Sequence, residues 1–358
     1  MNLETPALLL DLDKLESNLA AMAERCHRLG VTLRPHVKTH KCVEIARLQR
    51  DHGARGLTVS TLYEAEVLAD HGFDDLTWAF PVNPTRIEAA VDLSQRISLG
   101  LLVDSDEAIG ALEATGRPLE VWLKVDCGYH RAGVDPESPA ATRLARRLHE
   151  SSTLAFAGLL THSGHAYEPG PGSRRLEVAR QERDVMVGFA ERLRANGFTV
   201  PAVSVGSTPA MAHVDDLTGV DEARPGNYAL YDLTQVELGS CAVGDCAVSV
   251  LASVVSAGSG HAVIDAGALA LSKDPGPGTP AATGYGGVFD DYDAGTLAGD
   301  LRITSLSQEH GIVDRPLPVG CQLRILPNHS CLTVAQFDEL VVLRGENVVD
   351  RWKIWRGR

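Results

Sequence analysis

The chain has 358 residues, of which 44% are hydrophobic and 22% are charged, and this length predicts two domains of an ordinary globular protein. The formal net charge of −14 argues against nucleic acid or an anionic membrane surface as a partner. The seven cysteines show no CxxC spacing, which is typical of reduced thiols in a cytoplasm. We expect no signal peptide and no transmembrane helix, because no apolar stretch reaches about 18 residues.

Residues 7–11 predict a buried strand, and a helix with Leu15, Leu19 and Met22 at helical spacing follows it. Strand-like apolar runs then alternate with amphipathic helical stretches. The predicted strands are Thr32–Lys38, Leu57–Thr61, Leu76–Phe80, Ile97–Asp104, Leu119–Asp126, Phe156–His162, Ala202–Gly206 and Arg224–Leu230. The predicted helices include Leu62–His71, Glu107–Thr115, Ala140–Glu150 and Arg175–Asn196.

This alternation predicts a parallel (β/α)₈ barrel over residues 11–235. An open doubly wound sheet is the alternative, but no glycine fingerprint follows the first strand. After about residue 235 the sequence pattern changes to short predicted strands separated by Gly, Pro and Asp. These strands are Cys246–Ser253, Ala262–Asp265, Leu301–Ser305, Gln322–Ile325 and Glu339–Leu343. They predict an antiparallel β domain over residues 236–358, to which we also assign residues 1–10, with a long functional loop at Ser272–Phe289.

Lys38 is the central candidate for chemistry, in the segment Leu33–Lys41, which holds two lysines and two histidines. It ends the first predicted barrel strand, and in such barrels the chemistry lies where strands end. A desolvated lysine near other cations loses its proton more easily and can form a Schiff base with a carbonyl. A solvated basic loop is the alternative for this segment taken alone.

Three further segments follow predicted strands. Gly206, Ser207 and Thr208 have the composition of a phosphate cradle, although plain turns share it. Arg131, in the segment 124–134, could pair with a phenolate or a carboxylate, or could lie in a surface loop. Residues 161–167 carry two histidines and Tyr167 and could bind a metal or a cofactor ring, or form hydrogen-bonded core.

His329 and Cys331 form the last candidate site. We predict a strand here, in which positions i and i+2 face the same way, so that both side chains point to one side. Imidazole and thiolate are good zinc ligands, and only two protein ligands leave open positions, as in a catalytic site. The alternative is a buried cysteine beside a strand histidine.

Together these segments resemble the D-serine dehydratase and D-threonine aldolase family nearly end to end. The resemblance rests on Thr5-Pro6, residues 34–41, Gly206-Ser207-Thr208-Pro209, Arg224-Pro225-Gly226-Asn227-Tyr228, Asp265-Ala266-Gly267, Glu309-His310-Gly311 and Pro327-Asn328-His329-Ser330-Cys331. It implies the alanine-racemase type of pyridoxal-phosphate (PLP) fold, a barrel plus a β domain, in a homodimer.

The resemblance also implies roles for single residues. Lys38 matches the lysine that binds PLP, and Gly206, Ser207 and Thr208 match the phosphate-binding turn. The resemblance further assigns to the cofactor Arg131, Tyr167 and Tyr228. His329 and Cys331 match the two ligands of a divalent metal, which is zinc in the dehydratases. The aldolases tend to have aspartate at the position of Cys331 and bind manganese or similar ions, so cysteine favours zinc and the dehydratase branch.

The function implied is that of a PLP- and metal-dependent lyase whose small-molecule substrate is a D-3-hydroxy amino acid. We predict a D-serine dehydratase-like elimination of water, which gives a keto acid and ammonia. The same constellation could perform a retro-aldol cleavage to glycine and an aldehyde. A racemase would need a second base and no metal, and a PLP carrier protein tends to be a lone barrel. The sequence leaves the β-substituent of the substrate open.

Overall fold

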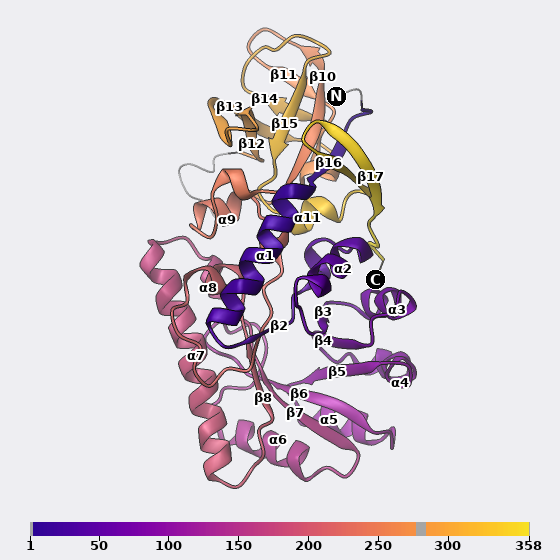
Figure 1. Ribbon diagram of the computed structural model, residues 1–358, viewed down its shortest axis with the longest axis vertical. Helices are drawn as coiled ribbons and strands as arrows, with labels where there is room; N and C mark the ends of the chain where they lie inside the picture. Colours follow the sequence, from indigo (N-terminus) through magenta and orange to yellow (C-terminus); the bar gives the residue numbers. More distant parts are fainter. Residues whose placement is uncertain (1–2, 277–283, 358) are drawn as a thin grey trace. The chain divides into compact units, whose positions relative to one another are not determined.

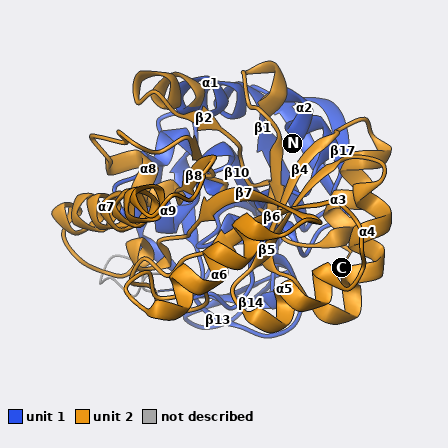
Figure 2. Cartoon of the chain, turned by 90° about the horizontal axis from the view of Figure 1, so that it is seen from below, with its two compact units in different colours: residues 1–22, 39–48, 227–356 blue, residues 23–38, 49–226, 357–358 orange. Residues whose placement is uncertain are grey.

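The computed structural model describes residues 3–276 and 284–357 (Figure 1). The chain divides into two compact units, which Figure 2 colours separately. Unit 1 consists of residues 1–22, 39–48 and 227–356, and unit 2 of residues 23–38, 49–226 and 357–358. Each unit is described by itself.

Unit 2 contains a parallel sheet of eight strands, which runs in the order β2-β9-β8-β7-β6-β5-β4-β3. The strands are β2 (Thr32–Leu33), β3 (Leu57–Val59), β4 (Asp75–Pro81), β5 (Ser98–Val103), β6 (Leu119–Lys124), β7 (Leu154–Leu160), β8 (Ala202–Val205) and β9 (Glu222–Ala223). A parallel bridge between His36 and Thr58 joins the two ends of this order, and Thr58 N donates to Pro35 O at 2.9 Å. The sheet is therefore closed, which excludes the open doubly wound alternative.

Helices connect the strands of unit 2. They are α3 (Leu62–Asp70), α4 (Ile87–Ser94), α5 (Asp106–Glu113), α6 (Pro139–Glu150), α7 (Gly172–Ala195) and α8 (Thr208–His213), with 3₁₀ turns η2 (Pro84–Arg86) and η3 (Gly164–Tyr167). The side chains of Thr61, Ser105 and Ser138 accept hydrogen bonds from backbone N–H groups in the first turns of α3, α5 and α6. Such caps satisfy donors that a helix start leaves without an intrahelical partner, and they fix where each helix begins.

The predicted barrel is confirmed, but its last strand has other bounds than we predicted. We predicted a strand at Arg224–Leu230, but β9 ends at Ala223 and Asn227–Ala229 form the 3₁₀ turn η4. Pro225 and Gly226 explain the difference, because proline has no N–H for a ladder and glycine weakens extended structure.

Unit 1 contains a nine-stranded sheet in the order β11-β14-β13-β12-β15-β10-β1-β16-β17. The strands are β1 (Ala7–Asp11), β10 (Val248–Ala257), β11 (Ala262–Ile264), β12 (Gly287–Asp291), β13 (Thr296–Leu306), β14 (Gly311–Val313), β15 (Gln322–Leu326), β16 (Glu339–Arg344) and β17 (Asn347–Lys353). All pairings are antiparallel except that of β1 with β16, and β10 also pairs with β11. This last pairing closes the strands β10 to β15 into an antiparallel barrel, which confirms the predicted β domain.

Short helices complete unit 1. They are α9 (Leu233–Glu237), α10 (Ala268–Leu271), α11 (Ser330–Val334) and η5 (Val243–Asp245), while α1 (Leu12–Arg28), α2 (Val43–Asp51) and η1 (Val37–Thr39) run through both units. Part of the predicted loop Ser272–Phe289 lies outside the described residues, and β12 begins within it at Gly287. Within the described ranges, no helix is both long and apolar enough to cross a membrane.

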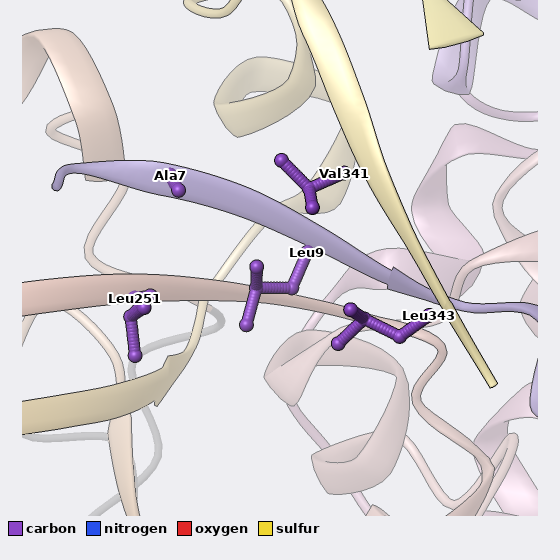
Figure 3. Close-up of a cluster of buried hydrophobic side chains, with 5 residues drawn as sticks. All are labelled: Ala7, Leu9, Leu251, Val341 and Leu343. Carbon is purple, nitrogen blue, oxygen red and sulfur yellow. The ribbon is translucent and has the colours of Figure 1, made fainter. Parts of the chain in front are cut away.

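The core of unit 1 explains why the sequence of β1 is a continuous apolar run. All five residues of β1 are buried, and the strand lies between β10 and β16 in the sheet. One face of this core consists of Ala7, Leu9, Leu251, Val341 and Leu343 (Figure 3). The N-terminal segment therefore contributes hydrophobic burial to a sheet whose other strands come from the second half of the chain.

Candidate active site

Lys38 lies in η1, just beyond the regular part of β2. Arg34 N donates to Ala223 O at 2.9 Å and His36 N donates to Pro225 O at 3.0 Å, so these bonds extend the ladder with β9. The chain then turns away from the sheet in η1, with Lys38 at its middle position and half-buried.

The predicted strand Thr32–Lys38 was therefore too long, since regular strand structure ends at Leu33. Pro35 contributes only a carbonyl to the barrel wall, because it has no N–H. The consequence for the site is small. Lys38 still stands where a barrel strand gives way to its loop, which is the end of a (β/α) barrel at which catalytic groups gather.

Four basic side chains of unit 2 act on the half-buried His162. They are Lys38, Lys124, Arg131 and Arg224. Removal of the His162 imidazole from water lowers its pKa well below the usual range, and the four positive charges lower this pKa further. The structure thus brings together Lys38 and Arg131, which we predicted, with Lys124 and Arg224, for which sequence reasoning gave no role.

Lys124 and Arg224 are 6% and 5% exposed. Burial, followed by the charge of Arg224, lowers the pKa of Lys124 to about 8. Burial also lowers the pKa of Arg224 to about 10, and its guanidinium donates to Ser204 Oγ and Thr161 O. In the sequence, Lys124 and Arg224 could have been recognised as site candidates because each is a charged residue next to an otherwise apolar strand end.

Tyr129 connects the loops that follow β6 and β7. Its ring lies edge-on to the His162 ring, with centroids 6.3 Å apart, and stacks with the His165 ring at 6.2 Å. The exposed Arg131 places its Cζ 5.1 Å from the centroid of the Tyr129 ring. A Cβ on Gly164 would approach this ring to 2.1 Å, so only glycine fits there.

The turn Gly206-Ser207-Thr208 joins β8 to α8. Gly206 has a φ of +113°, which favours glycine, and a Cβ there would lie 3.0 Å from Arg224 N. Ser207 caps α8 by accepting from Ala210 N at 3.3 Å, and its Oγ lies 3.3 Å from Ser163 Oγ. The turn therefore presents small side chains and hydroxyls beside the cluster of basic residues.

Glu182, in the middle of α7, ties two of these loops together. Its Oε1 accepts from Ser163 N at 3.0 Å and from Gly206 N at 3.2 Å. Burial raises the pKa of Glu182. Sequence reasoning missed this residue, because a glutamate inside an amphipathic helix gives no signal of a buried role. Tyr167, which we predicted as a cofactor residue, is the last residue of η3 and is half-buried.

Unit 1 holds the other predicted site residues. Tyr228 is fully buried in η4. His329 precedes α11 as its N-cap residue, and Cys331 lies in the first turn of that helix. The predicted strand was therefore wrong at this point, and so was the reason given for a shared face. The turn into α11 brings the two side chains within hydrogen-bonding reach of each other instead.

Asp274 fixes the imidazole of His329. The Nδ1 atom of His329 lies 2.7 Å from Asp274 Oδ2, which leaves Nε2 as the ring nitrogen available to a ligand. Burial acts to lower the pKa of His329, but the charge of Cys331 and the hydrogen bond to Asp274 outweigh it and raise this pKa to about 11. The same hydrogen bond lowers the pKa of Asp274.

The donor set of this pair fits a divalent metal with few protein ligands. Thiolate and imidazole are the ligands that zinc prefers, and a carboxylate bonded to the second imidazole nitrogen is the usual support of a ligating histidine. Within the part of the chain that the structure describes, no group of three or more His, Cys, Asp or Glu side chains could hold a metal ion. A metal held by His329 and Cys331 alone would have positions open for other oxygen donors.

Two family models match the chain. The one described as "Alanine racemase, N-terminal domain" matches residues 10–234, and the one described as "Putative serine dehydratase domain" matches residues 247–343. Their boundary falls between η4 and β10.

Curated relatives match over nearly the whole chain. The D-threo-3-hydroxyaspartate dehydratase of Delftia sp. (strain HT23) is 40% identical, over 100% of this chain and 98% of its own. The D-serine dehydratase of Dictyostelium discoideum is 34% identical, over 97% and 95%. The D-threonine aldolase of Arthrobacter sp. is 31% identical, over 98% and 92%.

Solved structures of the Delftia dehydratase also match. One has a TM-score of 0.95 at 39% identity and covers 100% of this chain and 99% of its own. Its variants include one in which a histidine is replaced by alanine, and one in which a cysteine is replaced by alanine "in the metal-free form".

The lowered pKa of Lys124 predicts a pH dependence of stability. The charged amine destabilises the folded chain, so this cost is complete below pH 8 and disappears as pH rises from about 8 towards the unfolded value of 10.5. Without cofactor, the free energy of unfolding should therefore rise by about 2 kcal/mol more between pH 7 and pH 9.5 in the parent chain than in Lys124→Met. Urea titrations of both proteins at the two pH values measure this difference. Parallel changes in the two proteins would show that Lys124 keeps an ordinary pKa.

Proposed function

We propose that this chain, which belongs to the D-serine dehydratase and D-threonine aldolase family of PLP enzymes, is a metal-dependent lyase that eliminates water from D-3-hydroxy amino acids. The observation that carries the proposal is the pair His329 and Cys331, with Asp274 behind the histidine. A thiolate ligand favours zinc, the metal that the resemblance associates with dehydration.

The basic cluster of unit 2 fits an anionic aldehyde cofactor. PLP, when bound, supplies a carbonyl for a Schiff base and an electron-withdrawing pyridinium ring. Lys38 would hold the aldehyde carbon, and the turn Gly206-Ser207-Thr208 would hold the phosphate. We assign to the remainder of the cofactor Arg131, Tyr167 and Tyr228. The buried basic residues of this cluster support the assignment, because buried cations need anionic partners and the phosphate of PLP would be one. The cluster is basic although the net charge of the chain is −14.

Lys38 also suits the role of the base. Its primary amine can accept a proton, and it acts on His162 together with Lys124 and Arg224. Its Nζ would remove the α-proton of the substrate, and the neutral His162 would not compete as a proton donor. A divalent cation on His329 and Cys331 would supply Lewis acidity for the departure of the β-hydroxyl, which is a poor leaving group.

The two domains have separate roles in this proposal. Within unit 1, the Cys331 thiol donates to Thr39 Oγ1 at 3.3 Å, and Thr39 follows Lys38 in the sequence. We propose that residues 11–235 bind the cofactor, and that residues 236–358, with 1–10, supply the metal. We further propose that the protein is a homodimer and that it is located in the cytoplasm.

The spacing of His329 and Cys331 supports metal binding. In the Delftia dehydratase, the histidine and the cysteine replaced in the two variants stand two positions apart, as His329 and Cys331 do here. That protein acts on D-threo-3-hydroxyaspartate, and we include this compound and D-serine among the substrates to be tested. The aldolase reaction remains the second candidate because the Arthrobacter aldolase is 31% identical.

Product analysis tests the reaction. The protein, supplied with PLP and zinc, should release a keto acid and ammonia in equal amounts from D-serine or D-threo-3-hydroxyaspartate, because Lewis acidity at the β-oxygen promotes its departure. The L-enantiomers serve as controls and should give no product. Formation of glycine and an aldehyde from D-threonine, without ammonia, would instead assign the retro-aldol reaction.

Lys38 should carry the cofactor. Borohydride reduction of the PLP-loaded protein, followed by peptide mapping, should find a pyridoxyl group on Lys38, because this lysine stands at a barrel strand end beside other cations. Lys38→Ala is the control and should remain unlabelled. A label on Lys41, Lys124 or Lys273 in the parent protein would disprove the assignment.

Loss of the metal should abolish turnover and leave the cofactor in place. In chelated protein, or in Cys331→Ala, turnover should fall by orders of magnitude, since Lewis acidity is worth several kcal/mol and about 1.4 kcal/mol is tenfold in rate. The Lys38 label should persist. Zinc should restore the chelated parent only, and Cys331→Asp should weaken the preference for zinc over manganese.

Cys321→Ala is the matched control for this experiment, because Cys321 is a partly exposed cysteine outside the proposed site, and its Sγ donates to Gln322 O. Its turnover should equal that of the parent. Full activity of the chelated protein, with no residual metal detected, would rule out the metal-dependent reaction.

A further inference from the structure

Asp232 is a buried carboxylate that organises the segment of His329 and Cys331. It is 1% exposed, and its Oδ2 accepts from Ser330 N at 2.8 Å, Ser330 Oγ at 3.1 Å and Asn227 Nδ2 at 2.6 Å. Its Oδ1 accepts from Gln235 N at 2.9 Å and thereby caps α9. The carboxylate therefore holds the backbone of the residue between the two metal ligands.

The first turn of α9 holds the residues before His329. Leu233 N donates to Pro327 O at 3.0 Å, and the N and Oγ1 of Thr234 donate to Asn328 O at 3.2 Å and 2.7 Å. The Nδ2 of Asn328 donates to Asp274 O at 2.9 Å, next to the carboxylate that fixes His329. Residues 327–330 are thus fixed by bonds from several elements of unit 1.

Asn227 adds a direct contact with the thiol. It is 4% exposed; one hydrogen of its Nδ2 bonds to Asp232, and the other is shared between Ser330 Oγ at 3.0 Å and Cys331 Sγ at 3.9 Å. The orientation of the amide follows from chemistry, because an ionised carboxylate can only accept and must face the NH₂ group. Among the described residues, Asn227 Oδ1 has no hydrogen-bond partner, so the side chain is placed for its donors.

Thr39 is a second neighbour of the sulfur. The thiol of Cys331 donates to Thr39 Oγ1 at 3.3 Å, and a hydroxyl can donate in the reverse direction when the sulfur is a thiolate. An amide N–H and a hydroxyl can then both face the thiolate. Such outer hydrogen bonds orient a ligand and tune the charge it offers to the metal.

We propose that Asn227, held by Asp232, is a positioning residue that prepares Cys331 to bind the divalent cation. The inference rests on the proposed function, because it needs a metal at Cys331. Asn227 belongs to the segment Arg224–Tyr228, in which the resemblance gave no role to the asparagine. It acts through the thiolate and not on the cofactor, so cation affinity is the property it controls.

The test compares zinc affinity in Asn227→Ala with that of the parent protein, loaded with PLP and titrated against a competing chelator. The dissociation constant for zinc should rise by about 10- to 100-fold, the usual effect of losing a ligand's outer partner. The thiolate-to-cobalt absorption of the cobalt-loaded protein should shift, because an N–H group no longer faces the sulfur. The pyridoxyl label on Lys38 should be unchanged.

Asn18→Ala is the matched control. Asn18 is also a buried amide of unit 1, 6% exposed, and its Nδ2 donates to Ala229 O at 3.3 Å and Asp245 O at 2.8 Å. Its loss removes two bonds to backbone carbonyls, one of them to Ala229 in the turn η4 that also holds Asn227, and it leaves the side-chain bonds of Asn227 in place. Zinc affinity and the cobalt spectrum should therefore remain those of the parent, so a general loss of stability is distinguished from an effect on the sulfur.

Asp232→Asn keeps the size of the side chain and provides a second variant if Asn227→Ala fails to fold. Its new NH₂ group removes an acceptor from Asn227 or Ser330, and zinc affinity should fall in the same direction. If the folded variants bind zinc within about threefold of the parent, the proposal is wrong.

Cys331→Ala distinguishes a failure of the proposed metal site from a failure of the role of Asn227. If Cys331→Ala binds zinc as tightly as the parent, the proposed metal site is wrong. If Cys331→Ala alone loses zinc, only the role of Asn227 is wrong.

Discussion

The closure of the parallel barrel at β2 is the constraint on which the position of Lys38 depends. β2 has only two regular residues, and Arg34, which follows them, lies between Asp75 at 2.6 Å and Glu222 at 2.8 Å. The side chains of Arg34 and Glu222 are 14% and 8% exposed, so removal of one partner would leave a largely buried charge unpaired. These ion pairs thus stabilise the closure of the barrel at Arg34, which lies four residues before Lys38 in the sequence.

A second consequence of closure is electrostatic. Parallel strands that end together bring their terminal side chains to one rim, so residues far apart in the sequence share one electrostatic environment. Lys124 ends β6, Arg131 lies in the loop that follows β6, and Arg224 follows β9, yet all three act on His162. Burial and mutual repulsion hold Lys124 and His162 closer to their neutral forms than they would be in water. The net charge of −14 therefore describes the surface of the chain and not its candidate site.

The sequence predicts the alternation of strands and helices because each strand is an apolar run of its own, and it predicts Lys38 because a lysine follows such a run. It fails where structure depends on distant partners. Ser330 N bonds to Asp232, 98 positions earlier, and this contact lets a five-residue helix form where the local pattern indicates a strand. Lys124 and Glu182 are missed for a related reason, since their burial is decided by neighbouring loops and not by their own segments.

A site with two protein ligands places unusual demands on what surrounds it. Four ligands fix each other through the metal, whereas two leave a cation free to pull each side chain towards another rotamer. In the proposed metal site, the imidazole of His329 is held by Asp274, and the backbone between His329 and Cys331 is held by Asp232. Both supports are carboxylates, so they also offset the charge of a divalent cation that the thiolate neutralises only in part. Rigid support from outside the ligand set thus allows open coordination positions, and open positions are what a substrate oxygen requires.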